Sequence, residues 1–106
     1  MKNYKLSNKA LKEYRTGAKK DKNLEVEILK IKLNCLINSA RTTRKKFLKT
    51  EYIFAKCIFT VNIFNTITAI RWDTTYPVAK EDEIKALFYS YSQSGLNRNG
   101  NKFVNM

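Results

Sequence analysis

Histidine is absent from this 106-residue chain, and glycine, proline and cysteine are scarce, with three, one and two residues. Without histidine, the commonest general base and a frequent zinc ligand are missing. Three glycines leave no glycine-rich loop to cradle a phosphate, and two cysteines cannot supply the four ligands of a structural zinc. The sequence therefore predicts no enzyme and no cofactor or metal.

Carboxylates offer one alternative. Asp73, or the run Glu81-Asp82-Glu83, has the oxygen ligands that Mg²⁺ prefers. The run, however, stands where a helix is expected to begin, and the positive end of the helix dipole already accounts for acidic residues there.

Apolar runs surround both cysteines, Cys35 and Cys57. Because free cysteine is among the most buried side chains, we expect two buried thiols in a reducing compartment. The N-terminus lacks the apolar core of a secretory signal, and Lys56, Asn62 and Asn65 interrupt the apolar stretch of residues 52–70. These features predict a soluble, cytoplasmic protein of one domain.

Charge is strongly unbalanced, with 21 Lys and Arg against 9 Asp and Glu and a net charge of +12. Residues 1–56 carry sixteen of the basic and five of the acidic groups, so nearly all the excess lies in that half. Such an excess predicts an anionic partner.

Residues 56–72 predict a β-hairpin, because they are rich in β-branched and aromatic residues and contain neither glycine nor proline. We expect strands at Lys56–Ile63 and Thr66–Trp72, with the reversal at Asn65-Thr66.

After Pro77 the apolar period changes to that of a helix, predicted at Lys80–Ser94 and ending at Gly95. Its apolar stripe is Ile84, Leu87, Phe88 and Tyr91. We expect this stripe to cover the hairpin, with Phe88 buried at its centre.

Residues 24–37 alternate between apolar and polar, which favours a strand bent near Leu29. A helix is the alternative, but on a helical wheel the apolar residues fall on nearly opposite faces.

A helix is predicted at Ala40–Tyr52, with Asn38 or Ser39 as its cap and Phe47, Leu48 and Tyr52 toward the core. Its other face carries Arg41, Arg44, Lys45, Lys46 and Lys49. Five cations so close together repel one another on a free helix and fit a phosphate partner better, with a merely solvated face as the alternative.

Residues 1–23 are expected to form a basic extension that orders on its partner, or else a solvated tail, with Ser7 as a possible helix cap. The remaining residues, 24–106, form the domain, which ends in a short edge strand at Lys102–Asn105. The extension holds the N-terminal cluster, made of Lys2, Lys5, Lys9, Lys12, Arg15, Lys19, Lys20 and Lys22.

The predicted fold is an α/β (α+β) two-layer domain. A mostly antiparallel sheet is covered by the two helices, near Ala40–Tyr52 and Lys80–Ser94.

Several short strings, in this order, resemble the eukaryote-type ribosomal protein twenty-two of the large subunit. Lys30-Ile-Lys-Leu-Asn-Cys35 resembles its first strand, and Phe47-Leu48 a pair on its first helix. Phe59-Thr-Val with Ile67-Thr-Ala resembles its hairpin, and Pro77-Val-Ala-Lys80 the start of its second helix. Leu96-Asn-Arg98 and Phe103-Val104 resemble the end of that helix and the strand after it.

The resemblance covers residues 24–104 and suggests a reduced, divergent member, since only Lys80 and Lys85 remain of a usually lysine-rich second helix. It implies a non-catalytic ribosomal protein that binds large-subunit ribosomal RNA beside neighbouring ribosomal proteins, without a membrane or a small-molecule substrate.

From the residues alone, the N-terminal cluster and the five cations of the first predicted helix are the expected RNA contact. Lys80, Lys85 and Arg98 are further candidates. Two alternatives stay open: a small basic phage or mobile-element protein that binds nucleic acid or an acidic host protein, and a protein that binds a membrane surface.

Overall fold

The expected hairpin is present in the computed structural model, which describes residues 2–102. Strands β4 (Cys57–Asn62) and β5 (Thr66–Trp72) pair antiparallel, and Asn65 reverses the chain between them with φ +59°. Asn65 is suited to this role because asparagine tolerates the left-handed region better than most residues.

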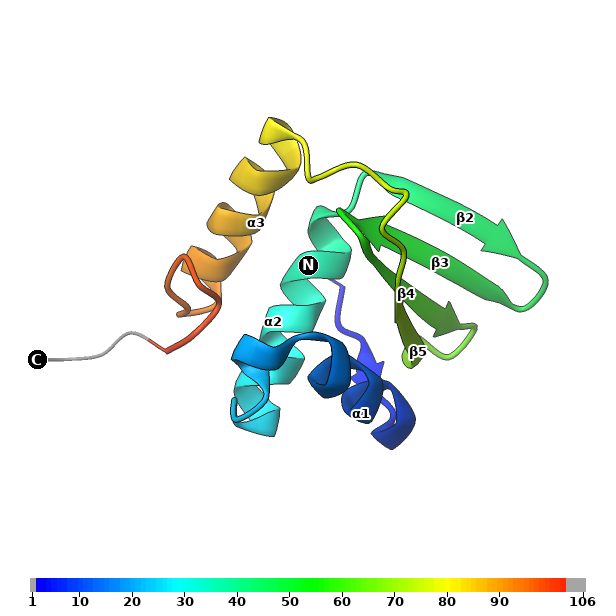
Figure 1. Cartoon of the computed structure of the whole chain (residues 1–106), viewed down its shortest axis with the longest axis horizontal. Helices are drawn as coiled ribbons and strands as arrows, with labels where there is room; N and C mark the ends of the chain where they lie inside the picture. Colours follow the sequence, from blue (N-terminus) through cyan, green and yellow to red (C-terminus); the bar gives the residue numbers. More distant parts are fainter. Residues whose placement is uncertain (1, 103–106) are drawn as a thin grey trace, which may run out of the picture.

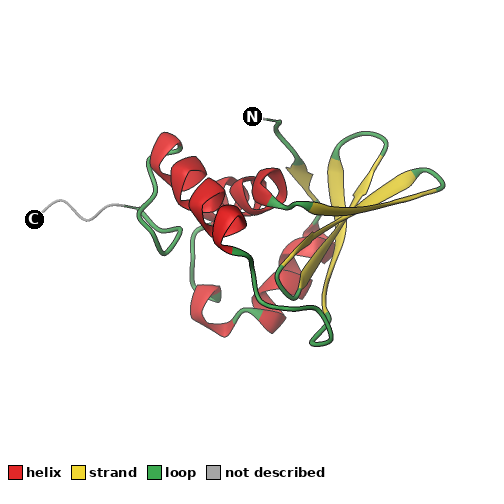
Figure 2. Ribbon diagram, turned by 90° about the horizontal axis from the view of Figure 1, so that it is seen from above, coloured by secondary structure: helices red, strands yellow, loops and turns green. Residues whose placement is uncertain are grey.

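The sheet has five strands in the order β1-β5-β4-β3-β2, where β1 is Lys5–Leu6, β2 is Thr42–Lys46 and β3 is Lys49–Phe54. All pairs are antiparallel except β1 with β5. The helices lie on one side of the sheet (Figures 1 and 2). An α+β domain with a mostly antiparallel sheet is confirmed.

The last helix, α3 (Glu81–Gln93), agrees with its prediction at both ends. The Glu83 carboxylate accepts a hydrogen bond from the Lys80 backbone, and Gly95 follows the helix with φ +77°. Its packing was predicted wrongly. Leu87 and Tyr91 are buried, but α3 packs on the helix α2 rather than on the hairpin, so Phe88 is 37% exposed.

Residues 24–37 do not form the predicted strand: they belong to helix α2 (Val26–Ser39). Helix α2 packs against β3 on one side and α3 on the other (Figure 1). A helix covered on two sides needs apolar residues on both, and this requirement produces the pattern that resembled strand alternation. Asn38 and Ser39, expected to begin a helix, instead end this one.

Residues 40–52 form β2 and most of β3 instead of the predicted helix. Threonines and the sequence Tyr52-Ile53-Phe54 favour a sheet, where the cations are also better spaced than on a helix. Phe47 and Leu48 do not reach the core. They form the turn between the two strands, 88% and 57% exposed.

The N-terminal segment folds as part of the domain. Ser7 caps helix α1 (Asn8–Gly17) by accepting a hydrogen bond from the Ala10 backbone, and a short 3-10 helix, η1 (Lys19–Asp21), follows. Tyr4, Ala10 and Tyr14 are buried in the core, and α1 packs on β5. The expected separate extension is therefore not seen in residues 2–22.

The predicted final strand, Lys102–Asn105, lies mostly outside the described residues. Lys102 makes one isolated bridge with Leu96 and is not paired with the five-stranded sheet.

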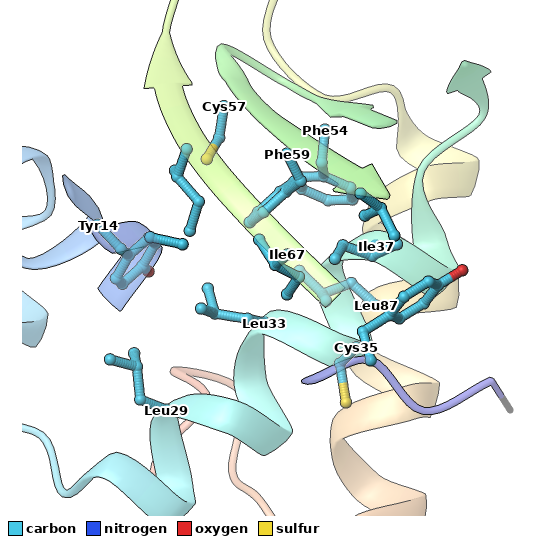
Figure 3. Close-up of a cluster of buried hydrophobic side chains, with 14 of the residues drawn as sticks. Tyr14, Leu29, Leu33, Cys35, Ile37, Phe54, Cys57, Phe59, Ile67 and Leu87 are labelled. Atoms are coloured by element: carbon cyan, nitrogen blue, oxygen red, sulfur yellow. The ribbon is translucent and has the colours of Figure 1, made fainter. Parts of the chain in front are cut away.

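The core lies between the sheet and α1, α2 and α3, with Phe59 and Ile67 facing Leu29 and Leu33 (Figure 3). Cys35 and Cys57 are buried free thiols, as predicted. Burial raises the pKa of Cys57 to about 12, so this thiol stays protonated and unreactive at neutral pH.

A buried polar network joins four segments of the chain: α1, η1, α2 and the turn after α3. Lys32 of α2 donates to the Asp21 carboxylate at 2.6 Å and to the Asn99 backbone oxygen at 3.0 Å. The Tyr14 hydroxyl donates to the same Asp21 oxygen at 2.7 Å. Burial and the Asp21 carboxylate raise the pKa of Tyr14, so its hydroxyl remains a donor.

Two phenylalanines test the packing. Phe59→Ala should lower the free energy of unfolding by about 3–5 kcal/mol, because Phe59 is fully buried and its removal leaves a cavity. Phe88→Ala should cost less than about 1 kcal/mol, because its ring already meets solvent and the Arg98 guanidinium. Urea unfolding of both variants measures the difference. Equal losses would mean that α3 packs through Phe88 after all.

Candidate nucleic-acid interface

The face of the sheet turned away from the helices carries a cluster of charges. Arg44 of β2 and Glu51 of β3 are partners in register, and Glu51 is 4% exposed. Arg44, Lys46 and Arg71 approach its carboxylate at 3.6, 3.3 and 3.3 Å. One carboxylate therefore holds three cations that come from β2 and β5, on opposite sides of it.

The carboxylate of Glu51 is charged under ordinary conditions. Burial by itself raises the pKa of Glu51, but the hydrogen bond from Arg71 and the nearby charges of Lys46 and Arg71 hold the pKa below its usual range. A charged, nearly buried carboxylate fixes the cations around it, since each would lose this contact by turning away.

Positive charge exceeds negative charge on this surface. Lys49 alternates to the same face as Glu51 and pairs across the strands with Asn62. We call Arg44, Lys46, Lys49 and Arg71 with Glu51 the outer face. Four cations against one anion leave a net positive charge that can attract a further anion. Arg44, Lys46 and Arg71 are roughly half exposed, so such an anion can reach them.

Part of the same side of the sheet is covered by the chain. The segment between β5 and α3 runs across the sheet toward β2 (Figure 1), where Arg44 donates to the Tyr76 hydroxyl. Lys56 donates to the backbone oxygens of Thr74 and Tyr76 and so holds this segment down. The open surface is therefore the part nearer the β2–β3 turn.

Four large apolar side chains project from the turns at that end. Phe47 and Leu48 form the β2–β3 turn, and Ile63 and Phe64 lie in the β4–β5 turn. The two turns are neighbours because Lys49 and Asn62 pair at their bases. Exposed aromatic rings beside fixed cations are the combination on which nucleic-acid bases stack while phosphates are neutralised.

A second basic surface follows α1 and η1. Lys12, Arg15, Lys19 and Lys22 line a hollow of about 680 Å³ together with Asn8 and Leu11. Arg15 donates to the Leu24 backbone oxygen at 2.9 Å, which fixes its guanidinium at the hollow's edge. Four of the eight residues of the N-terminal cluster therefore line one hollow, and none of them belongs to the outer face.

The other predicted cations are dispersed. Lys2 lies over the Tyr4 ring, Lys5 is in β1, Lys9 is exposed on α1, and Lys20 is in η1. Arg41 lies 3.9 Å from Asp82, and Lys45 points to the face of the sheet opposite to Arg44. On α3, Lys80 is the N-cap residue and Lys85 pairs with Glu81. Arg98 lies over the Phe88 ring.

Sequence reasoning did not single out Arg71 or Glu51. Alternation along β5 could have placed Arg71 opposite the buried residues of its strand. Glu51 had no such signal, because its role depends on the β2–β3 pairing that was missed.

Between residues 2 and 102, no three His, Cys, Asp or Glu side chains lie close enough together to hold a metal. Of the helices described, none is both long and apolar enough to cross a membrane.

Comparison with known proteins adds no assignment: no family model, curated protein or solved structure matches this chain. The resemblance to the ribosomal family stays a prediction based on short strings. The order of elements no longer adds to it, because residues 30–35, expected as that family's first strand, lie within α2.

Replacement of Glu51 tests the charge cluster. Folding lowers the pKa of Glu51. Its charge therefore gives its full contribution to stability at pH values above the unfolded-state pKa. This contribution disappears as the pH falls through the folded-state pKa. Glu51→Gln should therefore be less stable at pH about 7 by about 1–3 kcal/mol, a difference that closes toward pH about 3. Urea unfolding across this range measures it. A difference independent of pH would assign the loss to packing instead of charge.

Proposed function

We propose that this protein binds nucleic acid, and that the outer face contacts the phosphate backbone. The observation that carries the proposal is the arrangement of Arg44, Lys46 and Arg71 around the buried Glu51 carboxylate. These side chains are held in place before any ligand arrives, so binding loses little side-chain entropy. The two guanidinium groups can each take a phosphate with two hydrogen bonds.

The exposed turns favour nucleic acid over other anionic partners. Phe47 and Phe64 stand beside the cationic surface and offer rings to unpaired bases, a contact that an acidic protein surface does not need. The cations contact phosphates without reading sequence, so this surface predicts affinity for single strands in general and not for one sequence.

Binding to ribosomal RNA within the large subunit is the narrower form of this proposal. Its support is the basic composition, which predicts no catalytic or metal site, and the short strings that resemble the ribosomal family. The alternative is a small basic phage or mobile-element protein that binds nucleic acid outside the ribosome.

The salt dependence of binding tests the outer face. If its four cations meet four phosphates, log K should fall against log salt with a slope of about −3 for a single strand. Arg44→Gln with Lys49→Gln should flatten this slope by about 1.4, because two phosphate contacts are lost while Lys46 and Arg71 still hold Glu51. Fluorescence anisotropy with a labelled oligonucleotide gives the slope.

Two control pairs with the same change of charge decide between surfaces. Lys80→Gln with Lys85→Gln should leave the slope unchanged. If Lys12→Gln with Lys22→Gln flattens the slope and the outer-face pair does not, the hollow along α1 is the contact and the present assignment is wrong.

The ribosomal form has its own test. Tagged protein in cells should co-sediment with large subunits at moderate salt, and the outer-face pair should weaken this association more than the Lys80/Lys85 pair. Wild-type protein that binds oligonucleotides but stays at the top of the gradient would support the alternative instead.

A further inference from the structure

On the helix side of the sheet, away from the outer face, five segments of the chain surround a pocket of about 580 Å³. Leu36, Phe54, Trp72, Val78 and Leu87 supply apolar walls. Lys19, Lys20, Lys56 and Arg98 stand among its lining residues, and the buried pair of Asp21 and Lys32 also lines it. The volume falls within the range of clefts that hold small ligands, roughly 300–1,000 Å³.

We propose that this pocket binds a nucleotide, a planar base carrying one phosphate. The ligand is either a free mononucleotide or the terminal nucleotide of a strand, since both present the same base and phosphate. The proposal stands independently of the outer face, because the two surfaces share no residue.

Cations outnumber carboxylates in the wall of the pocket. Among the lining residues, five cations face one carboxylate, so an anionic ligand is favoured. Lys56 already donates to two backbone oxygens, but Lys19, Lys20 and Arg98 are exposed. None of these three is in an ion pair seen in residues 2–102, so each can turn to a phosphate in the pocket, Arg98 by leaving the Phe88 ring.

The buried pair of Asp21 and Lys32 forms a polar part of the pocket wall. Lys32 Nζ donates to Asp21 Oδ2 and to the Asn99 backbone oxygen, which uses two of its three hydrogens. Asp21 Oδ2 also accepts from the Tyr14 hydroxyl. Within the described residues this leaves one hydrogen of Lys32 and the Oδ1 acceptor of the paired Asp21 without a protein partner. A base edge with a carbonyl next to an N–H satisfies both, whereas an acyl chain would cover them without a partner.

Trp72 gives the pocket an aromatic wall. The Trp72 indole lies against α1, with its ring 5.9 Å from that of Tyr14. Gly17 makes this approach possible, because a Cβ there would stand 1.9 Å from the indole nitrogen. Trp72 is still 43% exposed, so a flat surface remains for a base to stack on.

Trp72 is the only tryptophan of the chain, so its fluorescence reports on the pocket directly. Titration of the full chain with the common nucleoside monophosphates should change the emission in a saturable way for at least one base. The matching nucleoside and inorganic phosphate should each bind at least about tenfold more weakly, because each supplies only part of the contacts. Calorimetry provides the same affinities without the fluorophore.

Lys20→Gln with Arg98→Gln should weaken binding of the mononucleotide about tenfold or more and leave binding of the nucleoside unchanged. Both side chains are exposed, so the fold should be unaffected. Lys80→Gln with Lys85→Gln removes the same charge from α3 outside the pocket and should change neither affinity.

A 5′-phosphorylated oligonucleotide and its 5′-hydroxyl counterpart separate the two sources. If the ligand is a strand end, the phosphorylated strand displaces the mononucleotide and the hydroxyl strand does not. If neither strand displaces it, the ligand is free nucleotide. Arg44→Gln with Lys49→Gln should retain mononucleotide binding, so a failure of the outer face is distinguishable from a failure of the pocket.

Three results would overturn the proposal. The first is no change in Trp72 emission and no heat of binding with any monophosphate. The second is a Lys20/Arg98 double variant that binds the mononucleotide as tightly as the wild type. The third is an affinity for inorganic phosphate equal to that for the best nucleotide.

Discussion

The ion pair between Asp21 and Lys32 is the interaction on which the helical side of the fold depends. It joins η1 to α2, and through the Asn99 oxygen it also fixes the turn after α3. Charges so deeply buried are costly unless paired, and loss of one partner typically costs about 3–5 kcal/mol. Gly100 belongs to the same arrangement, because a Cβ there would stand 2.7 Å from the Lys32 side chain. The Tyr14 hydroxyl of α1 donates to the same carboxylate, and the Trp72 wall of the pocket packs against the Tyr14 ring, so the anchor also reaches this wall.

Two parts of the fold could be predicted from the sequence because their signals were local. The β4–β5 hairpin has the composition of a half-buried sheet, and α3 has a single apolar stripe with acids at its start and glycine at its end. Helix α2 could not be recognised in the same way, because it is covered on two sides and its two apolar faces resemble alternation. Phe88 shows the same limit: the helix was predicted correctly, but its apolar stripe does not say which side chains will be buried or what the helix will pack on, and Ile84 and Phe88 are exposed.

The outer face was predicted in part. Arg44, Lys46 and Lys49 were expected to bind an anionic partner, yet as a helix face, on which Lys45 would have joined them. Alternation along β2 places Lys45 on the other face of the sheet from Arg44 and Lys46. The pairing of the strands places Arg71 of β5 on the same face as Arg44 and Lys46. The buried carboxylate that organises the face is visible only once the register is known, because no spacing within the chain connects residues 44, 51 and 71.

The pairing of β1 with β5 determines the order in which the domain can close. Strands β2 to β5 are consecutive and can pair as each emerges, but Lys5 meets Thr66, and Ser7 donates to the Ile67 oxygen at 3.1 Å. At a synthesis rate of about 5–20 residues per second, the first strand waits about 3–12 seconds for its partner. Throughout that time the basic N-terminal segment is on the nascent chain without the sheet edge that orders it. Among the strands, the one nearest the N-terminus is therefore the last to be paired.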